Sequence, residues 1–173
     1  MIQIIENLLE DGDLQSIQNL LLGEDFPWFF YPYVIYEDEE FEISNYQLVH
    51  TFYKDKVEGY QTIHSTYFNI LNPIIEKLNS RVMIRIKANL RPAALSHSKP
   101  RYHTDIDVMK GTTAIFYVNS NNGYTLFKDT QQKVESVENR VVIFPTPTKH
   151  SGIICTDQPS RVVINFNYIS KNV

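Results

Sequence analysis

The hydrophobic pattern changes its period near residue 80. Before that point, apolar residues recur every three or four positions, which is the period of an amphipathic helix. One such stretch begins at Asp13, a candidate N-terminal cap, and ends at Gly23. Its apolar face consists of Leu14, Ile17 and Leu21. After residue 80 the period becomes two, as in half-buried strands, so the pattern predicts helices and loops first and strands afterwards.

Two further features lie before residue 80. A second helical pattern covers residues 62–78 and contains Pro73, which either kinks this helix or begins a new one with Asn72 as its cap. The aromatic stretch FPWFFYPYVIY, residues 26–36, predicts either a segment that covers the core or a binding lip, and its large rings favour the core. The acidic run at residues 37–40 predicts a solvated loop.

The second half of the chain consists of short strand-like segments. In RVMIRIKANL, residues 81–90, apolar Val82, Ile84, Ile86 and Ala88 alternate with Met83, Arg85, Lys87 and Asn89. The later segments are GTTAIFYVN, YTLFKD, RVVIFP, HSGIICT and RVVINFNY, separated by turn-rich pieces such as NSNNG and TDQPS. Strands at such short intervals predict an antiparallel sandwich or barrel, so the expected fold class is α+β and mainly β, with the helices bracing one sheet. We expect one domain, residues 1–173, with helical support and a lip in residues 1–80 and the β core in residues 81–169.

Composition narrows the class of protein. With 43% hydrophobic residues and 13% aromatic residues, the chain is that of an ordinary globular protein. The formal charge of −4 disfavours a dedicated nucleic-acid binder. Cys155 is the one cysteine, which excludes an internal disulfide and a cysteine-rich zinc site. No apolar run approaches the roughly 20 residues that span a bilayer, and the N-terminus is acidic, so we expect a cytoplasmic protein without a membrane anchor.

The stretch RYHTDIDV, residues 101–108, contains the strongest chemical signal. In a strand, residues two apart point the same way, so His103 and Asp105 would present an imidazole and a carboxylate together. Asp107 shares that face and is a rival ligand. A third ligand is available in His150, because the 45 residues between Asp105 and His150 suffice for about four short strands that bring the chain around a barrel. Two histidines and one carboxylate form the facial triad typical of non-haem Fe(II).

A charged residue in the last strand adds a second signal. In RVVINFNY, Arg161, Val163 and Asn165 share one face, opposite an apolar face. A buried arginine needs an anionic partner, because an unpaired buried charge is costly. A dicarboxylate held by both arms of the Arg161 guanidinium would supply one.

The ordered set His103-x-Asp105, His150 and Arg161 resembles the pattern of the Fe(II)- and 2-oxoglutarate-dependent oxygenases. It is most similar to their prolyl-hydroxylase-like branch, including the small bacterial and phage members, and the similarity covers about residues 81–168. The resemblance implies a double-stranded β-helix, which is a jelly-roll, cupin-like barrel. It implies that His103, Asp105 and His150 bind iron, with the family spacing favouring Asp105 over its rival, and that Arg161 binds the distal carboxylate of 2-oxoglutarate.

The same resemblance implies the activity and further contacts. Tyr117, Asn89 and Asn165 match positions at which family members contact the cosubstrate, and Thr125 matches a supporting position in a turn. The expected protein is a dioxygenase that needs Fe(II), 2-oxoglutarate and O2, with ascorbate as a candidate stimulant. It would hydroxylate a small molecule or a peptide or protein, with release of succinate and CO2, in the host cytoplasm if the chain is encoded by a phage.

Several alternatives stay open at this point. A prolyl hydroxylase acting on a peptide or protein is the alternative specification. A nucleic-acid demethylase is disfavoured because that branch has a second arginine six residues after the first, where this chain has Asn167. A non-catalytic cupin-like binding protein would have no need of Arg161. The sequence identifies neither the substrate, the source nor the oligomeric state, and it leaves open whether Arg85, Lys87 and His97 contact the substrate.

Overall fold

The computed structural model describes residues 1–35, 46–55, 63–106 and 110–171. Eleven strands are found in these ranges, and they form two antiparallel sheets. The strands of the larger sheet are β1 (Gln3–Ile5), β2 (Phe29–Tyr31), β3 (Gln47–Lys54), β4 (Ile63–His64), β5 (Ser80–Pro92), β6 (Thr112–Tyr117), β9 (Val141–Pro145) and β11 (Ser160–Ser170). The strands of the smaller sheet are β7 (Tyr124–Phe127), β8 (Lys133–Glu135) and β10 (His150–Ile153).

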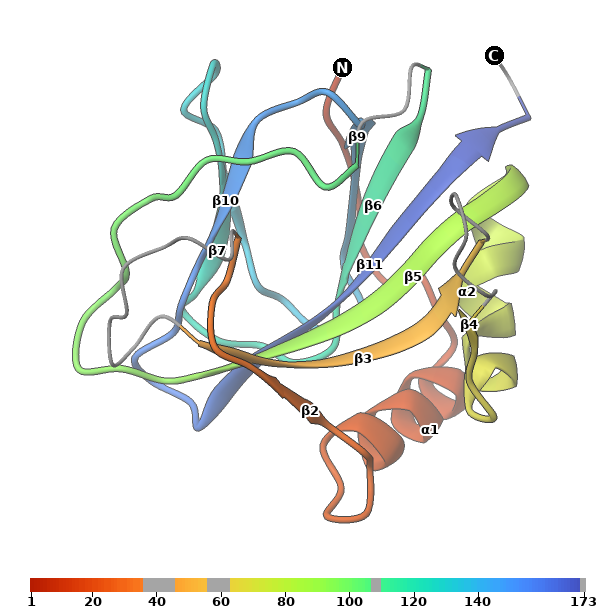
Figure 1. Cartoon of the computed structure of the whole chain (residues 1–173), viewed down its shortest axis with the longest axis horizontal. Helices are drawn as coiled ribbons and strands as arrows, with labels where there is room; N and C mark the ends of the chain where they lie inside the picture. The colour runs from red at the N-terminus through yellow and green to blue at the C-terminus, as the bar shows by residue number, and fades with distance from the viewer. Residues whose placement is uncertain (36–45, 56–62, 107–109, 172–173) are drawn as a thin grey trace.

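The two sheets face each other as the walls of a barrel. The larger sheet has the order β1-β9-β6-β11-β5-β3-β2, with β4 added to β3, and the smaller has the order β10-β7-β8. Figure 1 shows the small sheet on one side of the curved large sheet and the helices on the other. The mainly β, double-stranded β-helix fold predicted from the sequence is therefore confirmed.

The helices differ in detail from the prediction. Helix α1 (Asp11–Leu21) has Glu10 as its N-terminal cap, three residues before the predicted cap Asp13. A new helix does begin beside Pro73: α2 (Asn72–Lys77) has Pro73 as its second residue and follows a short 3-10 helix, η1 (Phe68–Leu71). Two expectations were wrong: the predicted cap is the first residue of α2, and residues 63–64 belong to β4. Proline fixes the φ angle for a helix start but disfavours a continuous helix through residues 62–78.

A continuous apolar core joins the helices to the large sheet. On β11, Val162, Ile164 and Phe166 are completely buried against this core, and Ile17 and Leu21 of α1 contribute from the other side. These are the apolar positions that the period of two in β11 and the helical period in α1 predicted. The packing fixes one face of β5 and β11 and thereby directs their other face into the barrel.

The expectation of mainly helix and loop before residue 80 was incomplete. Strand β3 lies in the large sheet between β5 and the edge strand β2, and β1, β2 and β4 also come from this part of the chain. In the sequence QLVHTFYK of β3, Gln47 and His50 are buried, and a register shift lies between Thr51 and Tyr53. Buried polar residues and a bulge hide the hydrophobic alternation that would have revealed the strand.

The aromatic stretch divides between core and surface. Phe26 is buried and packs edge-on against Trp28, at 5.0 Å between ring centroids. Phe29, Phe30 and Tyr31 lie on the edge strand β2 and are 60%, 61% and 43% exposed. The core interpretation therefore holds only for the beginning of the stretch. The acidic run at 37–40 lies outside the described residues.

A second departure from simple alternation lies in β5. A register shift between Asn167 and Tyr168 of β11 leaves Val82 43% exposed, while Met83 packs against the core. From Arg85 onwards the alternation is regular. The bulge therefore does not turn Arg85 and Lys87 away from the barrel.

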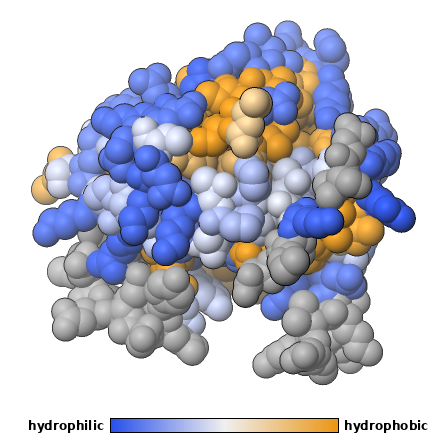
Figure 2. Space-filling model, turned by 90° about the horizontal axis from the view of Figure 1, so that it is seen from above, coloured by the Kyte–Doolittle hydropathy of each residue, from blue (hydrophilic) through white to orange (hydrophobic). Residues whose placement is uncertain are grey.

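The surface is mixed in character. Figure 2 shows one face on which apolar atoms gather in a patch bordered by hydrophilic side chains. Within the described ranges, no helix has both the length and the apolar character that a membrane crossing requires.

Candidate metal centre and dicarboxylate pocket

The two histidines come from distant segments that meet as an isolated β-bridge. His103 lies in an extended segment of residues 101–106, which is not the regular strand that the alternation predicted. Its amide donates to the carbonyl of His150, the first residue of β10, and the reverse bond closes the pair, both at 3.0 Å. The two imidazole centroids are thereby held 4.7 Å apart.

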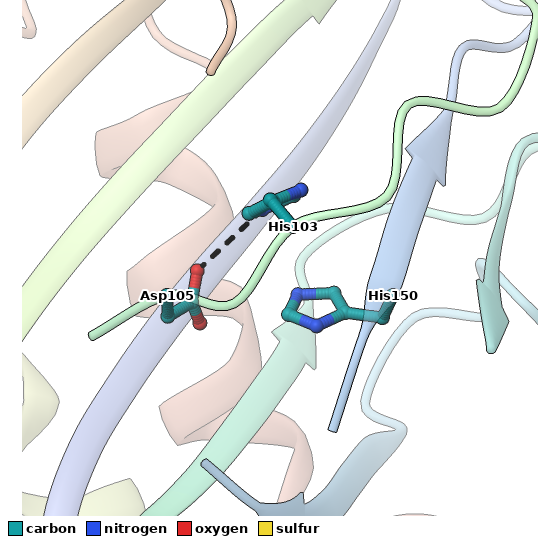
Figure 3. Close-up of side chains that lie close together, drawn as sticks. All are labelled: His103, Asp105 and His150. Carbon is teal, nitrogen blue, oxygen red and sulfur yellow. Dashed lines mark ion pairs between the residues drawn. The ribbon is translucent and has the colours of Figure 1, made fainter. Parts of the chain in front are cut away.

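Asp105 completes a group of three candidate ligands. One ligand atom from each of His103, Asp105 and His150 lies within 4.8 Å of the others. Figure 3 shows these three side chains directed toward one another, with His103 Nε2 3.8 Å from Asp105 Oδ1. Two imidazole nitrogens and one carboxylate oxygen at these separations fit a divalent metal of the Fe(II) type. The rival ligand Asp107 lies outside the described residues.

The carboxylate of Asp105 is held by side chains from two strands of the large sheet. Asn167 of β11 donates through Nδ2 to Oδ2 at 3.3 Å, and Asn165 approaches Oδ1 at 3.5 Å. Arg85 Nη2 lies 3.7 Å from Oδ1, and Arg85 Nε also donates to Asn167 Oδ1 at 2.9 Å. Burial alone would raise the pKa of Asp105, but the positive charges around it lower that pKa overall. The carboxylate is therefore ionised and ready to bind a cation.

His103 is held in its neutral form. Burial, followed by repulsion from His150, lowers the pKa of His103 to about 4, even though Asp105 acts in the opposite direction. A neutral imidazole is the form that binds a metal, so at neutral pH no proton has to be displaced from His103.

The guanidinium of Arg161 lies at the other end of the same cavity. Arg161 is 4% exposed, and it donates from Nε to Ser136 Oγ at 2.8 Å and from Nη2 to Thr125 Oγ1 at 3.1 Å. Among the described residues, no group accepts a hydrogen bond from its third nitrogen, Nη1. A Cβ on Gly152 would lie 3.4 Å from Nη1, and one on Gly123 would lie 2.8 Å from the Arg161 Cδ.

No carboxylate of the described residues pairs with Arg161. Burial lowers the pKa of the guanidinium, which is the cost of removing a cation from water. A buried cation with unused N–H donors on Nη1 and two small neighbours fits an external carboxylate.

One cavity connects the metal ligands with Arg161. Its lining includes His103, Asp105, His150, Arg161, Asn89, Asn165, Lys87, Arg91, Thr125 and Gly152. Asn165 Oδ1 is buried and has no hydrogen-bond partner, as expected of a group that faces a ligand. Asn89 and Asn165 are thus placed where a cosubstrate contact requires them, and these contacts stay predictions.

Tyr117 is placed differently. It is fully buried, and the cavity lining described above does not include it. Its hydroxyl donates to Thr125 Oγ1 at 2.8 Å, and its ring lies 5.5 Å from the Arg161 guanidinium carbon. Tyr117 therefore supports Thr125 and Arg161, and a direct contact with the cosubstrate stays a prediction.

The other three histidines and the cysteine do not line the cavity. His50 is buried among aromatic rings and binds the Pro27 carbonyl and Ser65 Oγ. His64 is exposed beside Phe68. His97 lies in a loop with its Nδ1 2.8 Å from the Ile154 carbonyl, and Cys155 is a buried free thiol.

Sequence reasoning missed three residues of the site. Ser136 accepts a hydrogen bond from Arg161, and Gly123 leaves room for the Arg161 side chain. Both residues lie in loops next to β7 and β8, where the sequence has no periodic pattern that could identify them. Asn167 was noted only as a missing arginine, yet it contacts Asp105, Arg85 and Thr113. Its place two residues after Asn165, on the cavity face of β11, is the signal that could have revealed it.

Known structures share this fold. The chain is similar to a 2OG-Fe(II) oxygenase family protein from Burkholderia pseudomallei, with a TM-score of 0.67, 11% identity, and coverage of 97% of this chain and 85% of that one. A viral collagen prolyl hydroxylase from Paramecium Bursaria Chlorella virus-1, solved with 2OG, gives a TM-score of 0.60 at 12% identity and covers 97% and 96%. The non-heme alpha ketoglutarate dependent epimerase SnoN from nogalamycin biosynthesis gives 0.64 at 9% identity and covers 98% and 78%.

At these identities the similarity establishes the fold, and the resemblance seen in the sequence is confirmed at that level. No family model matches the sequence. No curated protein matches it either.

Proposed function

We propose that this protein is an Fe(II)- and 2-oxoglutarate-dependent dioxygenase. One observation supports this most strongly: a single cavity contains the His103, Asp105 and His150 donor set together with the buried guanidinium of Arg161. A metal site alone would not need Arg161, and a dicarboxylate site alone would not need the triad. Proteins of this fold that are described as 2OG-dependent add independent support.

The side chains of the cavity fit both iron and 2-oxoglutarate. His103, Asp105 and His150 would hold iron, and Arg161, fixed by Ser136 and Thr125, would hold the distal carboxylate of 2-oxoglutarate. Such a centre would use O2 as the oxidant: one oxygen atom would enter succinate as 2-oxoglutarate loses CO2, and the other would convert a substrate C–H bond to C–OH.

The chain's own part is to position these groups and to limit water. Asn165, Asn167 and Arg85 fix Asp105 by hydrogen bonds and charge, so the carboxylate keeps its orientation without the metal. Apolar Ile115 and Val163 line the cavity between these polar groups. A low-polarity wall strengthens the interaction of Arg161 with a carboxylate.

The direct test is product formation. Purified protein with Fe(II), ascorbate and 2-oxoglutarate is incubated in air, and succinate is measured with and without candidate substrates. We expect slow, iron-dependent succinate formation without a substrate and faster formation with one. His150→Ala should abolish it. Equal succinate formation in the parent and His150→Ala proteins, or none in a parent that binds iron, would refute the proposal.

A prolyl hydroxylase acting on a peptide or protein is a second candidate. It is favoured by the exposed Phe29, Phe30 and Tyr31 on edge strand β2, because β2 lies next to β3 and Gln47 of β3 lines the cavity. Exposed aromatic side chains beside a site are suited to extended peptides. If a proline-containing peptide stimulates succinate formation, Phe30→Ser should reduce that stimulation and leave the basal rate unchanged.

A further inference from the structure

Lys87 places an additional positive charge beside the candidate metal centre. It lies on β5, and its Cα pairs with that of Asn165 on β11, whose side chain reaches Asp105. Arg85 and Asn89 flank it two residues away on the same face of β5. The Lys87 side chain lines the cavity that also contains the triad and Arg161.

The ammonium of Lys87 has no counter-ion among the described residues. No described carboxylate lies within ion-pair distance, and no described group accepts a hydrogen bond from Nζ. The one carboxylate in the cavity lining is Asp105, which is already engaged by Arg85, Asn165 and Asn167. Burial, with repulsion from Arg85, lowers the pKa of Lys87 to about 8, so the side chain is still mainly protonated at neutral pH.

A count of formal charges shows that the cosubstrate leaves no negative charge to pair with the Lys87 ammonium. In the loaded site, the charges of Fe(II), Asp105, the 2-oxoglutarate dianion and Arg161 cancel. Arg85, Lys87 and Arg91 then remain as three positive charges around the cavity. Arg85 contacts Asp105 and Arg91 donates to the Gly152 carbonyl at 3.2 Å, whereas the ammonium of Lys87 has no such partner among the described residues. A buried cation without an anionic partner is costly, and the two carboxylates of 2-oxoglutarate already have Arg161 and the metal as partners.

We infer that the substrate of the proposed oxygenase carries an anionic group, a carboxylate or a phosphate, and that Lys87 binds it beside the metal centre. The inference rests on the proposed function and adds the substrate's chemical class. Lys87 is then a binding residue that selects acidic metabolites, or acidic side chains of a peptide, over neutral compounds. Arg85 increases the positive potential at this point while it holds Asp105.

The test measures anion binding near the metal. The protein is loaded with Mn(II), saturated with 2-oxoglutarate and titrated with inorganic phosphate, and 31P relaxation reports phosphate close to the paramagnetic ion. A second arm uses 13C-labelled acetate, and the tighter probe identifies phosphate or carboxylate as the preferred group. We expect saturable binding of at least one probe, weakened roughly ten- to a hundredfold in Lys87→Met, because a hydrogen bond to a charged group is lost.

Two matched variants separate this contact from general effects. Lys77→Met removes an exposed lysine from α2 that does not line the cavity, and should leave anion binding unchanged. Lys87→Arg keeps the charge and should keep most of the affinity. Thermal unfolding of each variant identifies any that fold poorly. If Lys87→Met folds poorly, Lys87→Arg decides whether the positive charge at this position maintains anion binding.

The outcomes distinguish this inference from the proposed function. If the parent binds neither Mn(II) nor 2-oxoglutarate, the proposed function fails. If it binds both but neither anion probe, or if Lys87→Met binds the probes as tightly as the parent, the inference fails alone. A comparable loss of 2-oxoglutarate affinity in Lys87→Met would also overturn it, because Lys87 would then serve the cosubstrate.

Discussion

The two faces of the β5–β11 pair differ in character: one is apolar and packs against the helices, and the other is polar and lines the cavity. Toward the helices, β11 presents Val162, Ile164 and Phe166, all fully buried in the apolar core. Toward the cavity, the same strand presents Arg161 and Asn165, separated by Val163. Because side chains alternate, one stretch of eight residues supplies both the packing that stabilises the fold and the groups that would bind ligands.

The difference shows how a strand can bear buried charge. On the helix side, close packing of apolar groups provides stability without polar partners. On the cavity side, Arg85 donates to Asn167, and Asn165 and Asn167 both donate to Asp105. Arg161 is fixed by the hydroxyls of Ser136 and Thr125. Changes on the first face should therefore reduce folding stability, and changes on the second should reduce ligand binding.

The largest contrast is expected between two buried histidines. His150 is 2% exposed in the triad and His50 is 5% exposed on the helix side, where it binds Pro27 and Ser65. His150→Ala should abolish tight Fe(II) binding and leave the fold intact. His50→Ala should destabilise the protein by about 1–3 kcal/mol, through lost hydrogen bonds and packing, and leave metal binding unchanged. Calorimetric titration with Mn(II) measures metal binding, and urea unfolding measures stability. Weaker Mn(II) binding by folded His50→Ala would contradict the assignment of His50 to stability alone.

The next effect is on stability alone. Phe166→Ala removes a fully buried ring between the sheet and the helices, so the free energy of unfolding should fall by about 3–5 kcal/mol. The affinity of the folded variant for Mn(II) should stay within a factor of a few of the parent's. A stability loss below about 1 kcal/mol would show that the helix side does not support the fold as described.

A smaller effect, confined to binding, is expected for Arg161→Ala. Loss of a hydrogen bond to a charged group costs about 1.5–3 kcal/mol, so 2-oxoglutarate affinity should fall roughly ten- to a few-hundred-fold. Arg161→Lys should restore part of it, since lysine supplies the charge without the two-armed geometry. Arg140→Ala, which removes a pair with Glu6 at the surface, is the matched control and should bind normally.

Two glycines give a finer test of the same contrast. A Cβ on Gly123 would lie 2.8 Å from Arg161 Cδ and from the Ile153 carbonyl, whereas a Cβ on Gly12 of α1 meets nothing within 4 Å. Gly123→Ala should therefore displace Arg161 and weaken 2-oxoglutarate binding. Gly12→Ala should leave binding unchanged and add up to about 1 kcal/mol of helix stability. Equal binding by both variants would show that Arg161 does not depend on Gly123.

The last effect concerns the pH dependence of stability in the metal-free protein. Folded His103, with its pKa lowered to about 4, is neutral at pH values where the unfolded chain, with an ordinary histidine pKa near 6.5, binds a proton. The folded state thus binds fewer protons, and this contribution to stability falls as pH drops from about 6.5 toward 4. Urea unfolding at several pH values should show the slope, and His103→Gln should reduce it. An unchanged slope in His103→Gln would exclude His103 as its source.

Much of the site could be predicted because the sequence preserves the strand period around it. The alternation in β11 placed Arg161 and Asn165 on one face, and the ordered histidines and Asp105 indicated a metal centre. The structure brings all of these to one cavity. The segment at residues 101–106 needed no regular strand for this, since the bridge between His103 and His150 fixes it.

The features of the fold and site that the sequence did not reveal depend on contacts between residues far apart in the chain. Strand β3 was missed because Gln47 and His50 are buried polar residues whose partners lie elsewhere in the chain. Ser136 and Gly123 were missed because their role is defined by Arg161, 25 and 38 residues later in the sequence. The predicted contact of Tyr117 with the cosubstrate stays a prediction, and the bond from its hydroxyl to Thr125 is a further contact that the strand pattern did not indicate.

The most direct test of the proposed oxygenase is an oxygen-free titration of the Fe(II) protein with 2-oxoglutarate, followed by optical absorption. The account predicts a charge-transfer band that saturates at one 2-oxoglutarate per protein, appears only with both Fe(II) and 2-oxoglutarate, and is absent in His150→Ala. No band in a parent protein that has bound iron, or an equal band in His150→Ala, would contradict it.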